Sequence, residues 1–178
     1  MRPNLPVLAF ALAALAVALI ANVALGDDRG HARATLTGYE ETPSTLSSPG
    51  RGELRATIDE GNSEITYELT FSGLTAVSAA HIHLGQRATT GGVSAFLCGG
   101  GGQADCPTIA GTVTGTIRPA NVIGPAAQGI AAGEWNELVA AMRAGYTYAN
   151  VHTTAFPGGE IRGQIRTRGG GNDRDDDD

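Results

Sequence analysis

The stretch that decides the fold class is RGELRATIDEGNSEITYELTFS, residues 51–72. Apolar and polar residues alternate on both sides of the turn DEGN, residues 59–62, and an alternation with a period of two is typical of a strand with one buried face. The apolar positions are Leu54, Ala56 and Ile58 before the turn and Ile65, Tyr67, Leu69 and Phe71 after it. The sequence therefore predicts a β-hairpin here.

Further short strands are expected on both sides of this hairpin, separated by clusters of Gly, Pro, Asn and Ser. They are residues 33–38, 79–84, 92–97, 111–117, 146–153 and 159–167. One segment differs, because residues 134–144 carry apolar side chains at helical spacing (Trp135, Leu138, Val139 and Met142) before Gly145. We expect an all-β domain, a Greek-key-like sandwich or barrel of about 7–9 short strands with one short helix.

The N-terminus reads as a targeting segment. Arg2 precedes an apolar run over residues 5–25, and Asp27 and Asp28 follow Gly26. This pattern predicts a secretory signal peptide over residues 1–26. A retained N-terminal anchor is the alternative, since about 20 apolar residues can span a bilayer. In both cases the domain is exported and is secreted, periplasmic or displayed at the cell surface; it touches a membrane only if the segment is retained.

The opposite end is Gly-rich and then acidic, and residues 168–178 are expected to form a disordered tail. The formal net charge is −6, and five Asp and one Arg in residues 171–178 supply most of it. The remaining chain is nearly neutral and its sequence shows no block of basic residues. This balance argues against nucleic acid as a partner.

The two cysteines, Cys98 and Cys106, enclose a short Gly-rich segment. In an oxidising compartment such a pair is expected to form a local disulfide. A cysteine-based metal or redox site is the weaker alternative, because the chain has no Cys-x-x-Cys motif and no histidine beside either cysteine.

The stretch AAHIHLGQ, residues 79–86, suggests a functional site. Along a strand, His81 and His83 project from the face opposite to the apolar Ala80, Ile82 and Leu84. The same rule gives two more polar rows, which are Asn150 with His152, and Glu160 with Arg162 and Gln164. If the three strands are neighbours, these side chains form one polar face.

Two interpretations of this face remain open. In the first, His81, His83 and His152 bind one divalent transition metal, copper or zinc, and Glu160 is a fourth ligand or a base. Redox or hydrolytic activity would then be possible. In the second, the same side chains form a hydrogen-bonded network that holds the strands in register, with Arg162 and Glu160 pairing with the imidazoles and Asn150.

Other chemistry finds no support in the sequence, and no catalytic residue is assigned. The chain lacks a Gly-x-Ser-x-Gly motif. The glycine run at residues 99–102 is not followed by the Lys-Ser/Thr pair and helix of a phosphate loop. The carboxylates show no spacing that identifies a glycosidase pair.

Several motifs together resemble the CHRD domain, which is named after chordin. They are LTGYEETP, GRGELRATID, ITYELTFSGLTAVSAAHIHLG, GTVTGTI and AGYTYANVHTTAFPGGEIRGQI, and they span residues 33–167. The resemblance implies an exported β-sandwich module without an assigned reaction. Our main hypothesis is therefore a non-enzymatic extracellular or envelope module with a binding or structural role, whose partner is a protein, a polysaccharide or a matrix component. The resemblance also implies that the polar residues of the three rows are signature positions, whereas the Cys98–Cys106 loop looks like an insertion.

The His-x-His strand also resembles those of Cu/Zn superoxide dismutases. Only His81, His83 and His152 lie within the expected domain, because His31 falls in a segment expected to be loose. Three histidines are too few for a two-metal centre, but they suffice for a single-metal site.

Overall fold

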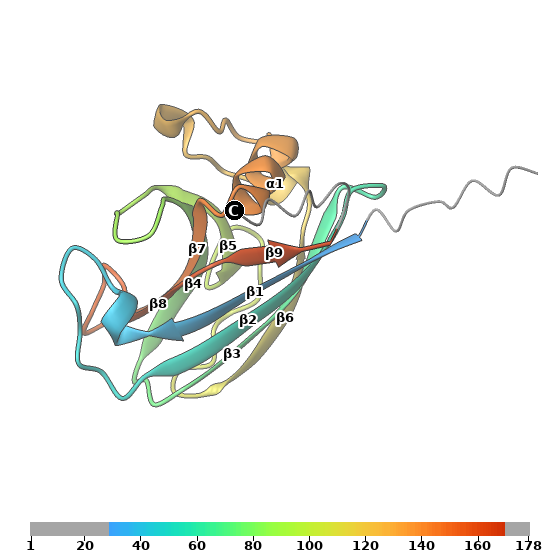
Figure 1. The fold of residues 1–178 in the computed structure, drawn as a ribbon. Coiled ribbons are helices and arrows are strands. Elements are labelled where there is room, and N and C mark those ends of the chain that lie inside the picture. The colour runs from blue at the N-terminus through green and yellow to red at the C-terminus, as the bar shows by residue number, and fades with distance from the viewer. Residues whose placement is uncertain (1–28, 170–178) are drawn as a thin grey trace, which may run out of the picture.

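The computed structural model describes residues 29–169; the expected signal segment and residues 170–178 of the expected tail lie outside this range. The described chain contains nine strands and one α-helix (Figure 1). Their bounds are β1 Arg29–Thr37, β2 Arg51–Asp59, β3 Glu64–Ser72, β4 Val77–Leu84, β5 Val93–Cys98, β6 Gly111–Ile117, α1 Trp135–Arg143, β7 Thr147–Thr153, β8 Ile161–Gln164 and β9 Arg166–Arg168.

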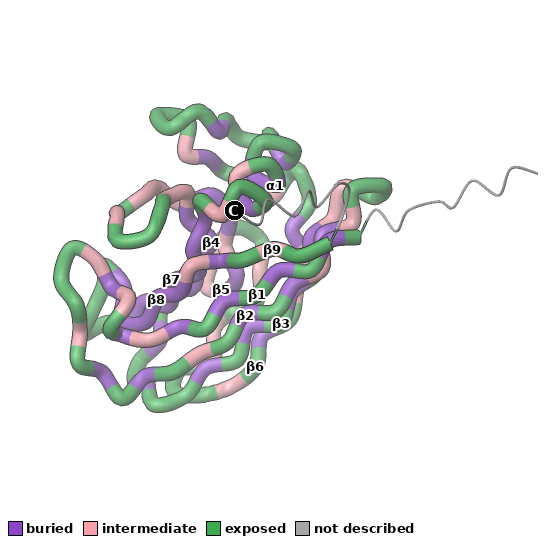
Figure 2. Tube along the Cα trace, viewed as in Figure 1, coloured by how far each residue is buried: buried purple, intermediate pink, exposed green. Residues whose placement is uncertain are grey.

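The hairpin predicted at residues 51–72 is confirmed. β2 and β3 pair in antiparallel register from Asp59 opposite Glu64 to Arg51 opposite Ser72. Buried and exposed residues alternate along both strands, as the colours along the tube in Figure 2 show. The hairpin forms because only one register buries all of its apolar side chains on the same face.

The nine strands form one antiparallel sheet, in the order β5-β4-β7-β8-β1-β2-β3-β6, with β9 paired to β1. The sheet curls until its two edges, β5 and β6, approach each other. A hydrogen bond helps to join this seam, since the Tyr67 hydroxyl on β3 donates to the Leu97 carbonyl oxygen on β5 at 2.6 Å. The all-β prediction is confirmed, and the architecture is a nearly closed, barrel-like sheet.

The inward-facing apolar side chains of the strands form a single core, and α1 covers one end of it (Figure 1). The helix contributes Trp135, Leu138, Val139 and Met142, all of them buried. These residues recur at intervals of three and four and therefore lie on one face of the helix. The predicted helix is confirmed to within one residue at each end.

Two boundaries differ from expectation. β1 begins at Arg29 rather than Arg33, because its backbone pairs with β2 over the whole length from Arg29 opposite Asp59. His31 therefore lies in a strand and not in a loose leader. The strand expected at residues 159–167 is broken at Ile165 into β8 and β9, and β9 extends to Arg168, which had been assigned to the tail.

Within residues 29–169, no helix has the length and apolar character needed to span a membrane.

Candidate metal centre

The three polar rows do become neighbours. β7 lies between β4 and β8, so that Asn150 stands opposite His81 on one side and Arg162 on the other. Tyr148 stands in the same way between His83 and Gln164. This arrangement confirms that the polar rows share one region of the sheet.

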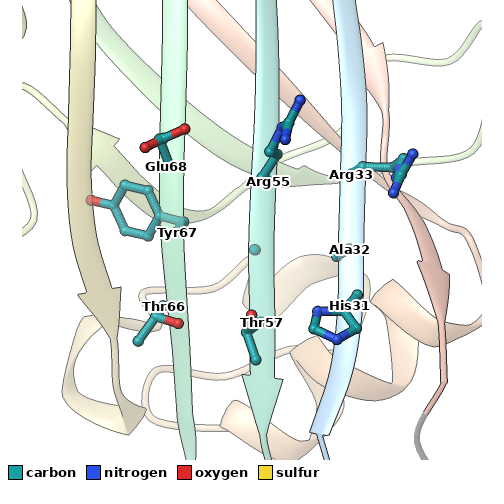
Figure 3. Close-up of a pocket in the computed structure, with 9 residues that line it drawn as sticks. His31, Ala32, Arg33, Arg55, Thr57, Thr66, Tyr67 and Glu68 are labelled. Carbon is teal, nitrogen blue, oxygen red and sulfur yellow. The ribbon is translucent and has the colours of Figure 1, made fainter.

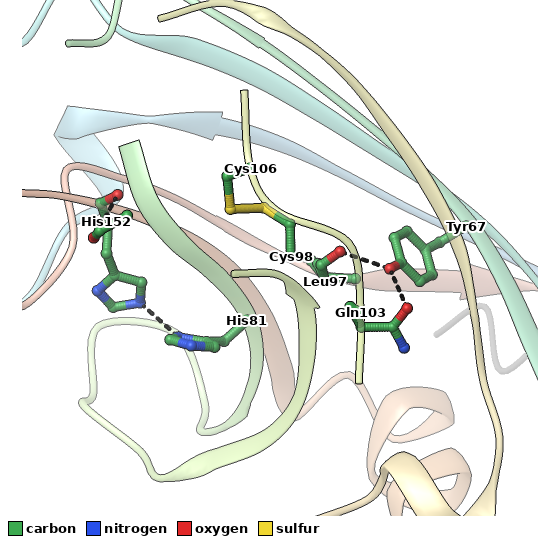
Figure 4. Close-up of a disulfide and its surroundings, with 8 residues drawn as sticks. Tyr67, His81, Leu97, Cys98, Gln103, Cys106 and His152 are labelled. Carbon is green, nitrogen blue, oxygen red and sulfur yellow. Dashed lines mark hydrogen bonds between the residues drawn. A yellow bond between two sulfur atoms is a disulfide. The ribbon is translucent and has the colours of Figure 1, made fainter. Parts of the chain in front are cut away.

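The three histidines of this region converge. His81, His83 and His152 each present a ring nitrogen within 4.8 Å of those of the other two. The closest pair is His81 Nδ1 and His152 Nε2, 2.9 Å apart, drawn as a dashed line in Figure 4. Imidazole nitrogens on one tetrahedral zinc lie about 3.3 Å apart, given Zn–N bonds of about 2.0–2.1 Å. A small inward movement would therefore bring all three nitrogens into coordination distance of one ion.

Backbone carbonyl groups determine which nitrogen of each ring carries the hydrogen. His83 Nδ1 lies 3.0 Å from the Gly91 oxygen, and His152 Nδ1 lies 3.0 Å from the Pro157 oxygen. A carbonyl oxygen only accepts, so both Nδ1 atoms are donors and both Nε2 atoms carry lone pairs. His81 Nδ1 then donates to His152 Nε2, which leaves His81 Nε2 with a lone pair as well.

The cluster favours neutral imidazoles. All three histidines are buried. Burial, with the neighbouring His152 and His83, lowers the pKa of His81 to about 3. Burial likewise lowers the pKa of His83 to about 4, and it lowers the pKa of His152. The neutral ring is the form that binds metal, so these histidines are ready to coordinate at neutral pH.

Two of the lone pairs have no partner. The Nε2 atoms of His81 and His83 are buried and accept no hydrogen bond from any residue in the 29–169 range. A buried polar atom left unsatisfied costs about 1–3 kcal/mol. Buried acceptors in proteins are usually paired, and in sites of this kind the partner is often a bound ion or water.

Aromatic rings enclose the cluster. Phe96 on β5 places its ring edge-on to His81, with centroids 4.4 Å apart. Tyr148 stacks on His83 at 4.8 Å, almost parallel to it. The sequence reasoning missed both rings, although Tyr148 is in alternation with Asn150 and His152 and was therefore detectable.

Tyr148 also anchors the loop between β4 and β5. Its hydroxyl accepts from the Gly91 N–H at 3.0 Å and donates to the Gly91 oxygen, the same oxygen that holds His83. A Cβ atom at Gly91 would lie 1.6 Å from the Leu84 oxygen. Only glycine fits this close approach, so Gly91 maintains the orientation of His83.

Glu160 is not part of the histidine cluster. Its two carboxylate oxygens accept hydrogen bonds from the hydroxyls of Ser48 at 2.6 Å and Thr153 at 2.8 Å. It is absent from the group whose nitrogens converge. The structure thus does not bring Glu160, the expected fourth ligand or base, into the group of converging histidines; Glu160 instead ties the segment before β2 to the end of β7.

Arg162 also differs from expectation, because its guanidinium donates neither to an imidazole nor to the Asn150 side chain among the described residues. Its guanidinium lies over the Tyr148 ring, 3.5 Å from the centroid, and donates to Thr42 Oγ1 and the Gln86 oxygen. Stacking on an aromatic face suits the planar guanidinium. Arg162, Tyr148 and His83 thus form a stack that supports one side of the cluster.

The remaining signature side chains serve the surrounding loops. Gln164 Nε2 donates to the Gly85 oxygen at 3.0 Å and to the Gly145 oxygen at 2.8 Å. Asn150 is buried, and its Oδ1 has no partner among the described residues. Gln164 therefore links the loop after β4 to the end of α1, whereas Asn150 lines the polar region itself.

A buried carboxyl group, Glu41, went unnoticed in the sequence reasoning. It is 5% exposed, and burial raises its pKa to about 7 against the opposing effects of Thr42 and Arg162. Glu41 lies in the stretch YEETP, which follows β1. No alternation covers this stretch, so its burial had no local sequence signal.

The expected disulfide between Cys98 and Cys106 is present (Figure 4). Its loop packs on the wall of the histidine cluster, because Cβ atoms at Gly100 or Gly101 would lie 2.6 Å from the Phe96 ring. The glycines let the loop backbone approach Phe96 closely, and Phe96 in turn contacts His81. The loop therefore supports the cluster from outside.

Comparison with known families identifies the domain. The model of the CHRD domain matches residues 32–165, close to the expected limits of 33–167. No curated protein and no solved structure gives a match. The matched segment runs from within β1 to just past β8 and includes every residue of the polar face. The chain belongs to the CHRD domain family.

Proposed function

We propose that this protein is an exported, non-enzymatic module whose cluster of His81, His83 and His152 holds one divalent transition-metal ion, copper or zinc. The observation that carries the proposal is the convergence of three buried imidazoles, among which His83 has a buried Nε2 lone pair without a partner in residues 29–169. A metal ion satisfies such lone pairs, and neutral imidazoles are favoured ligands of copper and zinc.

The surroundings resemble the outer shell of a metal site. Metal-binding histidines usually donate their second ring N–H to a carbonyl or a carboxylate, which orients the ring. His83 and His152 do this towards Gly91 and Pro157. In a purely hydrogen-bonded network, the second nitrogen of these rings would find donors as well; His83 Nε2 has none among residues 29–169.

Burial supports a non-enzymatic role. A catalytic metal keeps one coordination position open to water and substrate, whereas a structural metal is enclosed. Here each histidine is less than a tenth exposed, and Phe96 and Tyr148 cover two of them. Glu160, the base that the redox or hydrolytic alternative expects, is bonded to Ser48 and Thr153 instead.

Export of the module is supported by its disulfide, because such bonds persist mainly in oxidising compartments. This support is independent of the apolar segment at residues 5–25.

The test is metal titration of the purified protein, followed by calorimetry and by electron paramagnetic resonance of the copper form. We expect one equivalent of copper or zinc to bind, nitrogen couplings from three imidazoles, and a higher melting temperature. His83→Ala and His152→Ala should each weaken binding at least about tenfold, given the cost of losing a ligand. His31→Ala is the matched control, since His31 is exposed on β1. Equal binding by the control and the cluster variants would sink the proposal.

Addition of azide to the copper form tests the closed site. An unchanged spectrum supports an enclosed, non-enzymatic ion. A spectrum that changes because azide coordinates the copper would contradict it and favour the enzymatic alternative.

A further inference from the structure

The outer face of the sheet gathers arginines from three strands. Arg33 on β1 stands directly opposite Arg55 on β2 and Arg166 on β9. Two residues before Arg33 on β1, His31 stands opposite Arg168 on β9. All five side chains are exposed. We call these residues, Arg33, Arg55, Arg166, Arg168 and His31, the arginine strip.

Such a row of like charges is unfavourable unless something compensates for it. Neighbouring strands lie about 4.8 Å apart, and like charges in directly opposed positions destabilise a sheet. Arg55 is compensated by Glu53, which it contacts at 3.0 Å. Arg33, Arg166 and Arg168 form no ion pair with any residue between 29 and 169. Three guanidinium groups are therefore available to an anionic partner.

Two hollows flank Arg33. The first, of about 380 Å³, runs across β1, β2 and β3 and includes Arg33, Arg55 and His31 (Figure 3). The second, of about 310 Å³, includes Arg33, Arg166 and Arg87. Arg33 lines both hollows, which together follow the outer face across β3, β2, β1 and β9. We call the two hollows together the track.

Three acidic side chains lie along this track. Glu68 on β3 stands opposite Arg55, Glu53 pairs with Arg55, and Glu40 pairs with Arg87. None of them forms an ion pair with Arg33, Arg166 or Arg168. In the same hollow, Thr57 and Thr66 form a row with His31, next to the row that holds Arg33 and Arg55 (Figure 3). The track therefore offers charge and hydroxyl groups along an extended, shallow surface.

We infer that the arginine strip binds a linear acidic polysaccharide through its carboxylate or sulfate groups. Charge complementarity selects an anion, and the length of the track, shared by two hollows, selects a chain over a single small ion. Arginine suits this role because its planar fork binds carboxylate and oxyanion groups in a bidentate manner. The inference concerns a surface outside the histidine cluster and does not depend on the metal.

Two other polymers fit the surface less well. Single-stranded nucleic acid needs exposed aromatic rings for base stacking. The aromatic ring that lines the track, Tyr67, is 5% exposed, and its hydroxyl is bonded to Leu97 and Gln103. A protein partner needs a buried apolar anchor at the centre of its interface. The centre of the track is instead formed by Arg33, Arg55 and Thr57.

The test measures binding of the full chain to three immobilised probes: polygalacturonate, which bears carboxylates; dextran sulfate; and neutral dextran. We expect binding to one or both acidic polymers, weakening as salt rises to about 0.15 M, and none to dextran. The two acidic probes distinguish the carboxylate from the sulfate. The double variant Arg33→Gln/Arg166→Gln should bind at least about tenfold more weakly, with an unchanged melting temperature.

The matched control is Arg29→Gln/Arg118→Gln, which removes the same charge from arginines already paired with Asp59 and Glu64. An equal loss in the control would overturn the inference, because binding would then follow net charge alone. Tighter binding to a single-stranded oligonucleotide would also overturn it, as would no binding to either acidic polymer.

A last binding experiment uses a variant of the acidic segment, in which Asp173 and Asp175–Asp178 are changed. If polysaccharide binding appears only when these residues are changed to Asn, the strip is occupied by the chain itself and the inference fails. Chelation of metal should leave binding unchanged, so the outcome is separable from that of the metal titration.

Discussion

His81 Nδ1 on β4 lies 2.9 Å from His152 Nε2 on β7. One hydrogen must lie between these nitrogens, because two facing lone pairs would repel each other. It belongs to His81, since the Pro157 oxygen already accepts from the Nδ1 of His152. A shared metal ion would take the position of this hydrogen.

The first prediction concerns that hydrogen. When one equivalent of zinc is added, His81 should change from the Nδ1–H to the Nε2–H tautomer, because its Nδ1 becomes a ligand. His83 and His152 should stay Nδ1–H, since Gly91 and Pro157 still accept from them. Long-range ¹H–¹⁵N spectra of the imidazole rings report the change, with His31 as the internal control. An unchanged His81 tautomer at saturating zinc would contradict the proposed ligand atom.

The second prediction separates Glu160 from the metal. Glu160→Gln should lower the free energy of unfolding by about 1–3 kcal/mol, because Ser48 and Thr153 both donate to this group and an amide offers one acceptor and one donor. Metal affinity should be unchanged, as measured by titration calorimetry. Glu68→Gln, at an exposed position, is the control and should change neither quantity. Loss of metal binding in Glu160→Gln would restore Glu160 as a ligand.

The third prediction concerns pH. Burial raises the pKa of Glu41 from 4.5 to about 7, so between these pH values the folded state holds a proton that the unfolded state has lost. The stability that Glu41 contributes is complete below pH 4.5 and is lost as pH rises through about 7. The loss is about 3 kcal/mol, at 1.36 kcal/mol per unit of pKa. The histidines with lowered pKa values contribute more stability as pH rises, which opposes the effect of Glu41. The effect of Glu41 must therefore be isolated by comparison with a variant.

Glu41→Gln carries no ionisable group at this position and should remove that loss. The difference in unfolding free energy between the variant and the natural protein should therefore increase in favour of the variant from pH 4.5 to pH 7. Urea denaturation at each pH measures it, and Glu137→Gln on the exposed face of α1 serves as the control. A difference that is constant with pH would show that Glu41 is not the responsible group.

The fourth prediction concerns the disulfide. Cys98→Ala/Cys106→Ala should lower stability by about 2–3 kcal/mol, because the bond closes a short loop and restricts the unfolded chain. Since the loop glycines contact Phe96, amide hydrogen exchange near Phe96 and His81 should also accelerate. Exchange on β2, which the loop does not support, is the reference. An effect on stability without faster exchange at Phe96 would show that the loop does not brace the cluster.

Local sequence patterns predicted a large part of this structure. The alternation in residues 51–72 predicted the hairpin, and helical spacing predicted α1, because both patterns reflect which side chains must be buried. The same alternation assigned His81 and His83 to one face and His152 to another strand's polar row. These are properties of single elements, which a sequence contains directly.

The tertiary structure alone decided how those elements meet. The pairing of β4 with β7, which joins residues more than 60 positions apart, makes three histidines into one cluster. It also turned Glu160 towards Ser48 and Thr153, because two hydroxyl donors lie within reach there. In the same way, β9 brings Arg166 beside Arg33 and creates a basic strip on a chain of net charge −6. Alternation determines the face on which a side chain lies. Its neighbours depend on strand order and register, which are set by the burial of apolar side chains that are far apart in the chain.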